Sequence, residues 1–290
     1  MRFPMVEAAP HGGFDDDESG GALNDRMEVG PFDLPNGAVR GGDVAYGADP
    51  LQRLDVYRPA APSNAPVIMM VHGGGWARGD KRQWRVVKNK VTHWVGRGYI
   101  FVSTNYRMLP TTDPLEQADD IARALAFVQR TLESWGGDPS RLILMGHSSG
   151  AHLVALLTAD FAIPARAGAA PWLASVSLDS AAMDVERIMR RRHYLLYDAA
   201  FRRDPRFWRA ASPTQRLTCK PVAPMLIVCS TRRGDSYPQG RAFAEKAASF
   251  GAYADVMPVD LSHAEVNDFL GSESAYTDDV DAFFRTVGLA

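Results

Sequence analysis

The chain has 290 residues, of which 46% are hydrophobic and 23% charged, and its net charge is -2. This composition is typical of a globular protein with enough chain for one large α/β domain. The charge balance gives no sign of the basic domain that nucleic-acid binding requires. The longest apolar stretches, such as residues 66–71, are far shorter than the about 18 residues of a membrane span.

Two cysteines, Cys219 and Cys229, are too few for a disulfide framework or a zinc cluster. No metal-binding spacing occurs, so we expect no metal. The N-terminus Met1-Arg2-Phe3-Pro4 lacks the apolar core of a signal peptide. This predicts a cytoplasmic protein, although a secreted chain without its leader would begin in the same way.

Residues 1–45 are rich in glycine, aspartate and proline and show no hydrophobic periodicity. We interpret them as an irregular arm. An alternative interpretation is a partial lid that folds over a binding site. The remaining residues, 46–290, are predicted to form one domain.

Short runs of β-forming residues alternate with helical patterns along this domain. Strands are predicted at residues 54–57, 66–72, 99–105, 142–145, 173–178, 225–229 and 254–259. Helices are predicted at residues 84–96, 114–132, 151–159, 241–250 and 278–287. This alternation predicts a mostly parallel central sheet with helices on both faces.

The segment Gly146-His147-Ser148-Ser149-Gly150 lies between a predicted strand and a predicted helix. It has the form G-x-S-x-G, which requires that context. The strand must turn sharply into the helix there, and glycine at both ends avoids collisions with neighbouring backbone. The turn exposes the hydroxyl of Ser148, and the helix N-terminus favours negative charge beside it. Ser148 is therefore the candidate nucleophile.

A second glycine run, His72-Gly73-Gly74-Gly75-Trp76, follows another buried strand. Glycines let a loop present backbone N–H groups to the oxyanion of an acyl-transfer reaction. We assign this oxyanion hole to the N–H groups of Gly74, Gly75 and Ser149, and Gly73 is the alternative donor. A nucleotide-binding G-x-G-x-x-G turn is the rival interpretation, but Arg78 stands where it needs the last glycine.

A serine nucleophile needs a histidine base and an acid that orients it, in the chain order serine, acid, histidine. Only His193 and His263 lie well downstream of Ser148. His263 follows the strand predicted at 254–259, where active residues of parallel sheets collect. Asp235, shortly after the strand at 225–229, is the predicted acid, and Asp260 is the rival.

Residues 182–212 interrupt the alternation with eight arginines interspersed with aromatic residues. One interpretation is a solvated helical insertion whose aromatic side chains pack inward. Another is a cap over the active site that holds an anionic substrate, and nucleic-acid binding is the third. We expect this insertion to form part of the pocket wall.

At these motifs the chain resembles the α/β-hydrolase superfamily, in the esterase/lipase group of carboxylesterases and kynurenine formamidases. Asn105-Tyr106-Arg107 and His263-Ala264-Glu265-Val266-Asn267 extend the resemblance. It implies the α/β-hydrolase fold with a small cap, an acyl-enzyme intermediate and no cofactor. The first 45 residues lie outside it.

The sequence therefore predicts a carboxylesterase that acts on small-molecule esters through Ser148, Asp235 and His263. Trp76 and His147 are candidate substrate-binding residues. An arylformamidase is the alternative enzyme, and a binding protein that has lost its chemistry is the alternative of another class. Neither a nucleic acid nor a membrane is expected as a partner, and a homo-oligomer is compatible with the sequence.

Overall fold

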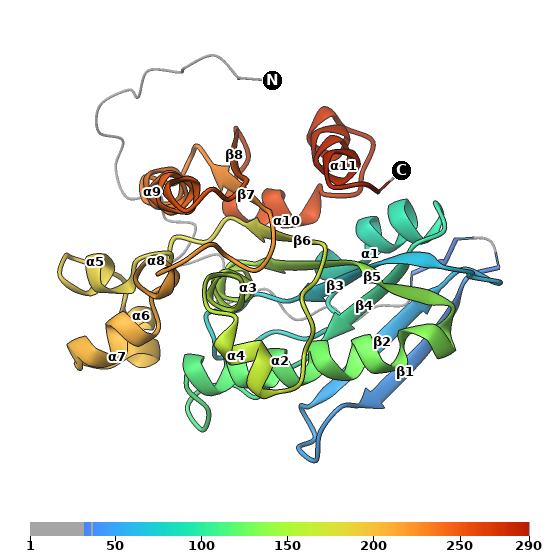
Figure 1. Ribbon diagram of the computed structural model, residues 1–290, viewed down its shortest axis with the longest axis horizontal. Coiled ribbons are helices and arrows are strands. Elements are labelled where there is room, and N and C mark those ends of the chain that lie inside the picture. Colours follow the sequence, from blue (N-terminus) through green and yellow to red (C-terminus); the bar gives the residue numbers. More distant parts are fainter. Residues whose placement is uncertain (1–31, 36, 290) are drawn as a thin grey trace.

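An eight-stranded sheet with the order β1-β2-β4-β3-β5-β6-β7-β8 forms the centre of the molecule (Figure 1). The computed structural model describes residues 32–35 and 37–289. The first two strands pair antiparallel with their neighbours, and all pairs from β4 to β8 are parallel. The strands are β1 (Val39–Ala45), β2 (Arg53–Arg58), β3 (Ala65–Val71), β4 (Ile100–Thr104), β5 (Gly137–His147), β6 (Ala174–Leu178), β7 (Met225–Ser230) and β8 (Ala254–Val259).

Helices connect the parallel strands and cover the sheet on both sides (Figure 1). They are α1 (Trp84–Lys90), α2 (Pro114–Thr131), α3 (Ser149–Ala159), α4 (Ala162–Arg166), α9 (Ser236–Ser249), α10 (His263–Asp268) and α11 (Ala275–Thr286). Four short helices lie between β6 and β7: α5 (Val185–Met189), α6 (Leu195–Phe201), α7 (Pro205–Ala210) and α8 (Pro213–Arg216). A mostly parallel central sheet with helices on both faces and an insertion before β7 confirms the predicted fold class.

The side chains of β3 alternate between the two halves of the core, as the period of a strand requires. Val67, Met69 and Val71 pack with α2 and α3. Ile68 and Met70 pack on the opposite face with α1 and α11. Because both faces are covered, all the residues of β4, β6 and β7 are buried, which explains their continuous apolar or small-residue sequences.

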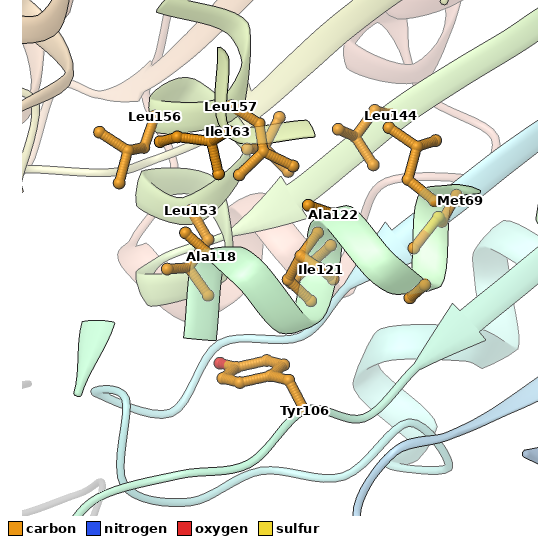
Figure 2. Packing of buried hydrophobic residues seen from close by; sticks show 14 of the residues in the cluster. Met69, Tyr106, Ala118, Ile121, Ala122, Leu144, Leu153, Leu156, Leu157 and Ile163 are labelled. Atoms are coloured by element: carbon orange, nitrogen blue, oxygen red, sulfur yellow. The ribbon is translucent and has the colours of Figure 1, made fainter. Parts of the chain in front are cut away.

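Helix α3 is the most enclosed helix of the fold, since all eleven of its residues are buried. Leu153, Leu156 and Leu157 of α3 pack near Ala118 and Ile121 of α2 (Figure 2). Tyr106, which follows β4, lies in the same cluster. The helix that begins beside Ser148 is therefore fixed along its whole length, which holds its first turn in place.

The structure corrects the predicted N-terminal boundary. Residues 39–45, which the sequence analysis placed in the irregular arm, form β1. This strand is mostly exposed and carries few apolar side chains, so it has no hydrophobic signal. Ion pairs of Arg40 and Lys81 with the buried Asp55 help to hold it to β2 and to the loop before α1. The rest of the predicted arm, residues 1–31, lies outside the described residues.

Two helices also differ from the sequence prediction. The helix predicted at 84–96 is α-helical only to Lys90 and continues as a π-helical turn, Val91–Val95. The segment after β8, where no helix was predicted, contains α10, which begins at His263. A capping box between Ser262 and Glu265 starts this helix. No helix in residues 32–35 and 37–289 is both long enough and apolar enough to cross a membrane.

We expect Leu156→Ala to lower the free energy of unfolding by about 2–5 kcal/mol, because it leaves a cavity in this close-packed layer. The matched control is Leu195→Ala, whose side chain is 84% exposed and whose loss should change stability by less than about 0.5 kcal/mol. Urea unfolding of both variants measures the difference. Equal costs would contradict the packing described for α3.

Candidate active site

Ser148 occupies the sharp turn between β5 and α3. Its backbone is strained, with φ of 54° and ψ of -119°. A Cβ on Gly146 would come within 2.4 Å of the Gly150 carbonyl oxygen, and one on Gly150 within 2.3 Å of the Val71 oxygen. Contacts this short are prohibitive for any side chain, so both glycines of the motif are required. The turn presents the Ser148 hydroxyl at the carboxyl end of the sheet.

The glycine loop after β3 lies directly beside Ser148. A Cβ on Gly73 would approach the Ser148 Cβ to 2.9 Å. Gly74 and Gly75 have φ values of 127° and 60°, conformations that glycine adopts at little cost. A Cβ on Gly75 would meet open space, whereas one on Gly74 would collide with the Arg78 carbonyl. The loop is therefore crowded on its inner side and open at Gly75, where a substrate oxygen has room.

Polar anchors hold the glycine loop in place. The Asn105 side chain accepts a hydrogen bond from the Lys81 backbone N–H and donates one to Asp80. The His72 ring stacks on Tyr106 with 4.6 Å between ring centroids. The Tyr106 hydroxyl also donates to the His72 carbonyl. These contacts connect the loop to the segment after β4, so the resemblance at Asn105-Tyr106-Arg107 has a structural reason.

His263 meets Ser148 as the sequence predicts. Its Nε2 lies 2.9 Å from the Ser148 Oγ. Its Nδ1 lies 2.6 Å from Oδ2 of Asp179. Because a carboxylate only accepts hydrogen bonds, Nδ1 carries the proton and Nε2 is free to accept one from the serine hydroxyl. This is the arrangement of a nucleophile, a base and an orienting acid.

The predicted acid is wrong: Asp179, not Asp235, contacts His263. Asp179 directly follows β6, as Ser148 directly follows β5, and its side chain is fully buried. Asp235 is exposed just before α9. The rival Asp260 is also exposed and pairs with Arg232. The loop after β7 instead turns Arg233 toward Asp179.

The Asp179 carboxylate accepts hydrogen bonds from several segments. Oδ1 accepts from the Ser230 backbone N–H at 2.8 Å and from the Ser236 hydroxyl. Oδ2 accepts from His263 and, at 2.9 Å, from Arg233. Burial alone would raise the pKa of Asp179, but the hydrogen bond from His263 and the Arg233 charge hold that pKa far below its usual range. The carboxylate is therefore ionised at any working pH.

The two residues that the sequence analysis proposed to bind substrate, Trp76 and His147, are buried and contact other histidines. His147 is 9% exposed, and its Nε2 donates to the His263 carbonyl oxygen at 2.9 Å. Burial and the neighbouring His263 lower the pKa of His147 well below its usual value, so its ring is neutral. Trp76 is 3% exposed and donates from Nε1 to Nδ1 of His152 at 3.2 Å.

The insertion between β6 and β7 packs against this same histidine. His152 Nε2 donates to the Ala211 carbonyl oxygen at 2.7 Å. The Trp76 ring contacts the rings of Tyr197 and Phe201 of α6, at centroid distances of 5.9 and 4.9 Å. The insertion therefore packs on the glycine loop and on the first turn of α3. The insertion thus lies beside the site, and its part in the pocket wall stays a prediction.

The aromatic side chains of the insertion point inward, as the solvated-insertion interpretation expects, whereas its arginines lie mostly on the surface. Several of these arginines are neutralised by acidic neighbours. Arg190 and Arg209 pair with Glu186, and Arg202 pairs with Asp113 at the start of α2.

Helix α10, which carries His263, is bound to α1 through buried polar contacts. The Lys90 Nζ is fully buried and donates to the Asn267 carbonyl oxygen at 2.6 Å and to that of Arg85 at 3.3 Å. The Asn267 side chain donates in return to the Arg85 carbonyl oxygen. Burial lowers the pKa of Lys90 to about 7, against the opposing charge of Asp268.

Known proteins match different parts of the chain. The BD-FAE family model matches residues 54–162, which include the glycine loop and Ser148. Esterase LipQ of Mycobacterium tuberculosis is 30% identical over 247 residues, 78% of this chain and 57% of that protein. A probable isoprenylcysteine alpha-carbonyl methylesterase of Oryza sativa is 35% identical over 39% of this chain and 27% of that protein. The chain thus spans between about a quarter and somewhat over half of these relatives.

Solved structures share the fold over nearly the whole chain. Esterase B from Lactobacillus rhamnosis has a TM-score of 0.70 at 20% identity, covering 88% of this chain and 87% of that one. A truncated carbohydrate esterase from gut microbiota has a TM-score of 0.73 at 17% identity and covers 86% and 96%. Thermogutta terrifontis esterase 2 phosphonylated by sarin has a TM-score of 0.68 at 21% identity and covers 87% and 96%.

The depressed pKa of Lys90 predicts a pH-dependent contribution to stability. Its pKa is about 7 in the folded chain and near the ordinary 10.5 when unfolded. Between these values the unfolded chain holds a proton that the folded chain lacks, so raising the pH favours folding. The free energy of unfolding of the wild type, minus that of Lys90→Met, should rise by about 1.4 kcal/mol per pH unit from pH 7.5 to 9.5. A difference that is constant over this range in urea titrations would show that Lys90 is charged in the fold.

Proposed function

Since the chain is an α/β-hydrolase of the esterase/lipase group, we propose that it is a serine hydrolase that cleaves carboxylic esters of small molecules. The observation that carries this proposal is the continuous line of contacts from the Ser148 Oγ through His263 to Asp179. In this arrangement His263 acts as the base and Asp179 as the acid that orients it. Asp235 has no part in the reaction.

The reaction has two halves. In the first, Oγ of Ser148 attacks the ester carbonyl carbon while Nε2 of His263 takes the hydroxyl proton. Asp179 stabilises the imidazolium that forms. The tetrahedral intermediate collapses, His263 gives its proton to the leaving alcohol, and an acyl-serine remains. In the second half, water attacks the acyl group with the same base, and the carboxylic acid leaves.

The oxyanion of each tetrahedral intermediate needs N–H donors. Ser149 is the first residue of α3, so its N–H has no acceptor within the helix and points toward the Ser148 side of the turn. Gly74 and Gly75 are the other proposed donors, supported by the open space beside Gly75. Together with the positive end of α3, these groups favour the negative charge that develops on the substrate oxygen.

The substrate pocket is proposed to lie between the glycine loop and the insertion. Trp76, Tyr197 and Phe201 form an aromatic cluster at the contact between these two segments. His152 joins this cluster at the first turn of α3 and contacts the Phe201 ring. These four side chains are at most 7% exposed, so the cluster fixes the insertion against the glycine loop and supports the proposed pocket from behind. The relatives named above are esterases, which favours an ester over a formamide as the bond that is cleaved.

Purified protein should hydrolyse p-nitrophenyl esters in a series from acetate to decanoate, with an optimum that reports the depth of the pocket. Ser148→Ala should lose activity by roughly 10⁵–10⁶-fold because it removes the hydroxyl that contacts Nε2 of His263. Ser134→Ala, on the exposed turn after α2, is the control and should retain wild-type activity. Retention of ester hydrolysis by Ser148→Ala would overturn the nucleophile, and a higher kcat/KM on N-formylkynurenine than on the best ester would overturn the ester assignment.

A further inference from the structure

Arg233 is a cation placed inside the contact between the base and its acid. Its Nη1 lies 2.9 Å from the Asp179 Oδ2 and 3.1 Å from the Asp179 carbonyl oxygen. The same nitrogen lies 3.0 Å from Nδ1 of His263. The Arg233 side chain is 18% exposed, while Asp179 is fully buried. A charge at this distance from the reacting imidazole is weakly screened by solvent.

The contact with His263 is one of charge and not a hydrogen bond. Nδ1 of His263 already carries the proton that it donates to Asp179, so it has no lone pair to accept a proton from the guanidinium. Arg233 donates to Asp179 instead. Two positive or potentially positive groups, the guanidinium and the imidazole, therefore share one carboxylate oxygen.

We propose that Arg233 is a positioning residue that keeps Asp179 oriented and opposes premature protonation of His263, so that the base stays available at mildly acidic pH. This inference rests on the proposed serine-hydrolase function. Before catalysis, Arg233 is paired with the ionised Asp179 beside a neutral imidazole. Protonation of His263 from solvent would place a second positive charge next to the guanidinium, which costs free energy. Without Arg233, the carboxylate would stabilise the imidazolium alone.

Arg233 is the cation that contacts His263. The other basic groups nearby are neutral, lie further along α10 or are paired with acids. His147, whose ring lies 4.6 Å from that of His263, is neutral. Lys90 contacts α10 four residues further along, at Asn267. Arg232 is balanced by two acids on the surface. Among the described residues, the titratable and charged groups that face the pair include Asp179 after β6, Arg233 and Arg232 after β7, Cys229 of β7, His147 of β5, Asp260 after β8, Glu265 of α10, Lys90 of α1 and Tyr276 of α11.

The acidic limb of the pH–rate profile, where the rate falls as the pH is lowered, distinguishes this role from a merely structural one. Removing the positive charge of Arg233 should move this limb to higher pH by about one unit, which is the usual effect of one charge at this distance. At a fixed pH on this acidic limb, the rate of the variant relative to its own plateau should then be about tenfold lower than that of the wild type. The alkaline plateau should stay within about threefold, because Ser230 and Ser236 still hold Asp179.

The experiment measures the rate of Ser148 labelling by a fluorophosphonate, and kcat/KM on the best p-nitrophenyl ester, from pH 4.5 to 9. Arg233→Gln keeps an N–H donor for Asp179 but removes the charge. Arg233→Lys keeps the charge but loses the planar fork. Arg232→Gln, the adjacent arginine that pairs with Asp260 and Glu265, is the matched control. Circular dichroism melting identifies any variant that is not folded at the assay temperature.

The proposal expects a displaced limb in Arg233→Gln, a limb close to wild type in Arg233→Lys and no displacement in Arg232→Gln. A lower plateau with an unmoved limb in Arg233→Gln would show that Arg233 only supports the structure, and it would overturn the proposal. An equal displacement in Arg232→Gln would also overturn it, since a distant surface charge would then suffice. Absence of labelling in the wild type at every pH would instead contradict the proposed nucleophile itself.

Discussion

A fully buried carboxylate, Asp179, is the constraint on which the active site depends. An ion without solvent must be paired and hydrogen-bonded. Four groups do this: the imidazole of His263, the guanidinium of Arg233, the Ser230 N–H and the Ser236 hydroxyl. They come from α10 and from the stretch between the end of β7 and the start of α9. The hydrogen bonds to this one carboxylate therefore fix the start of α10 and the loop after β7 relative to β6. Removing any one of the four leaves part of the charge uncompensated, and the other three then hold the carboxylate alone.

The second half of the site depends on close backbone packing around Ser148. Gly146 and Gly150 allow β5, α3 and the end of β3 to approach within distances that any Cβ would prevent. That approach brings the glycine loop beside the nucleophile, and Trp76 of the same loop then reaches His152 of α3. His152 also donates to Ala211 of the insertion. Helix α3, the glycine loop and the insertion therefore form one connected unit. Burial lowers the pKa of His152 to about 4, so this link stays neutral near pH 7.

Sequence patterns predicted the elements whose signals are local. The G-x-S-x-G turn, the glycine run and the buried parallel strands were recognised because residue types at fixed spacing determine them, and His263 was identified from its place after β8. Asp179 was missed because both Asp179 and Asp235 satisfy the order serine, acid, histidine, and the choice depends on which loop turns inward. The signal for Asp179 was present: it directly follows a buried strand, as Ser148 does. Strand β1 has no apolar periodicity, and the start of α10 was readable only from the Ser262–Glu265 capping box.

The identity of the acid is the central claim, and paired asparagine substitutions test it most directly. Asp179→Asn and Asp235→Asn each replace a carboxylate by an amide of the same size, one buried against His263 and one exposed. The measurement is kcat/KM on the best ester at pH 8 for folded samples of both. The account predicts a loss of roughly 10³–10⁴-fold for Asp179→Asn, as expected when a catalytic histidine loses its orienting acid, and a rate within about twofold of wild type for Asp235→Asn. The reverse result, with Asp235→Asn inactive and Asp179→Asn active, would contradict it.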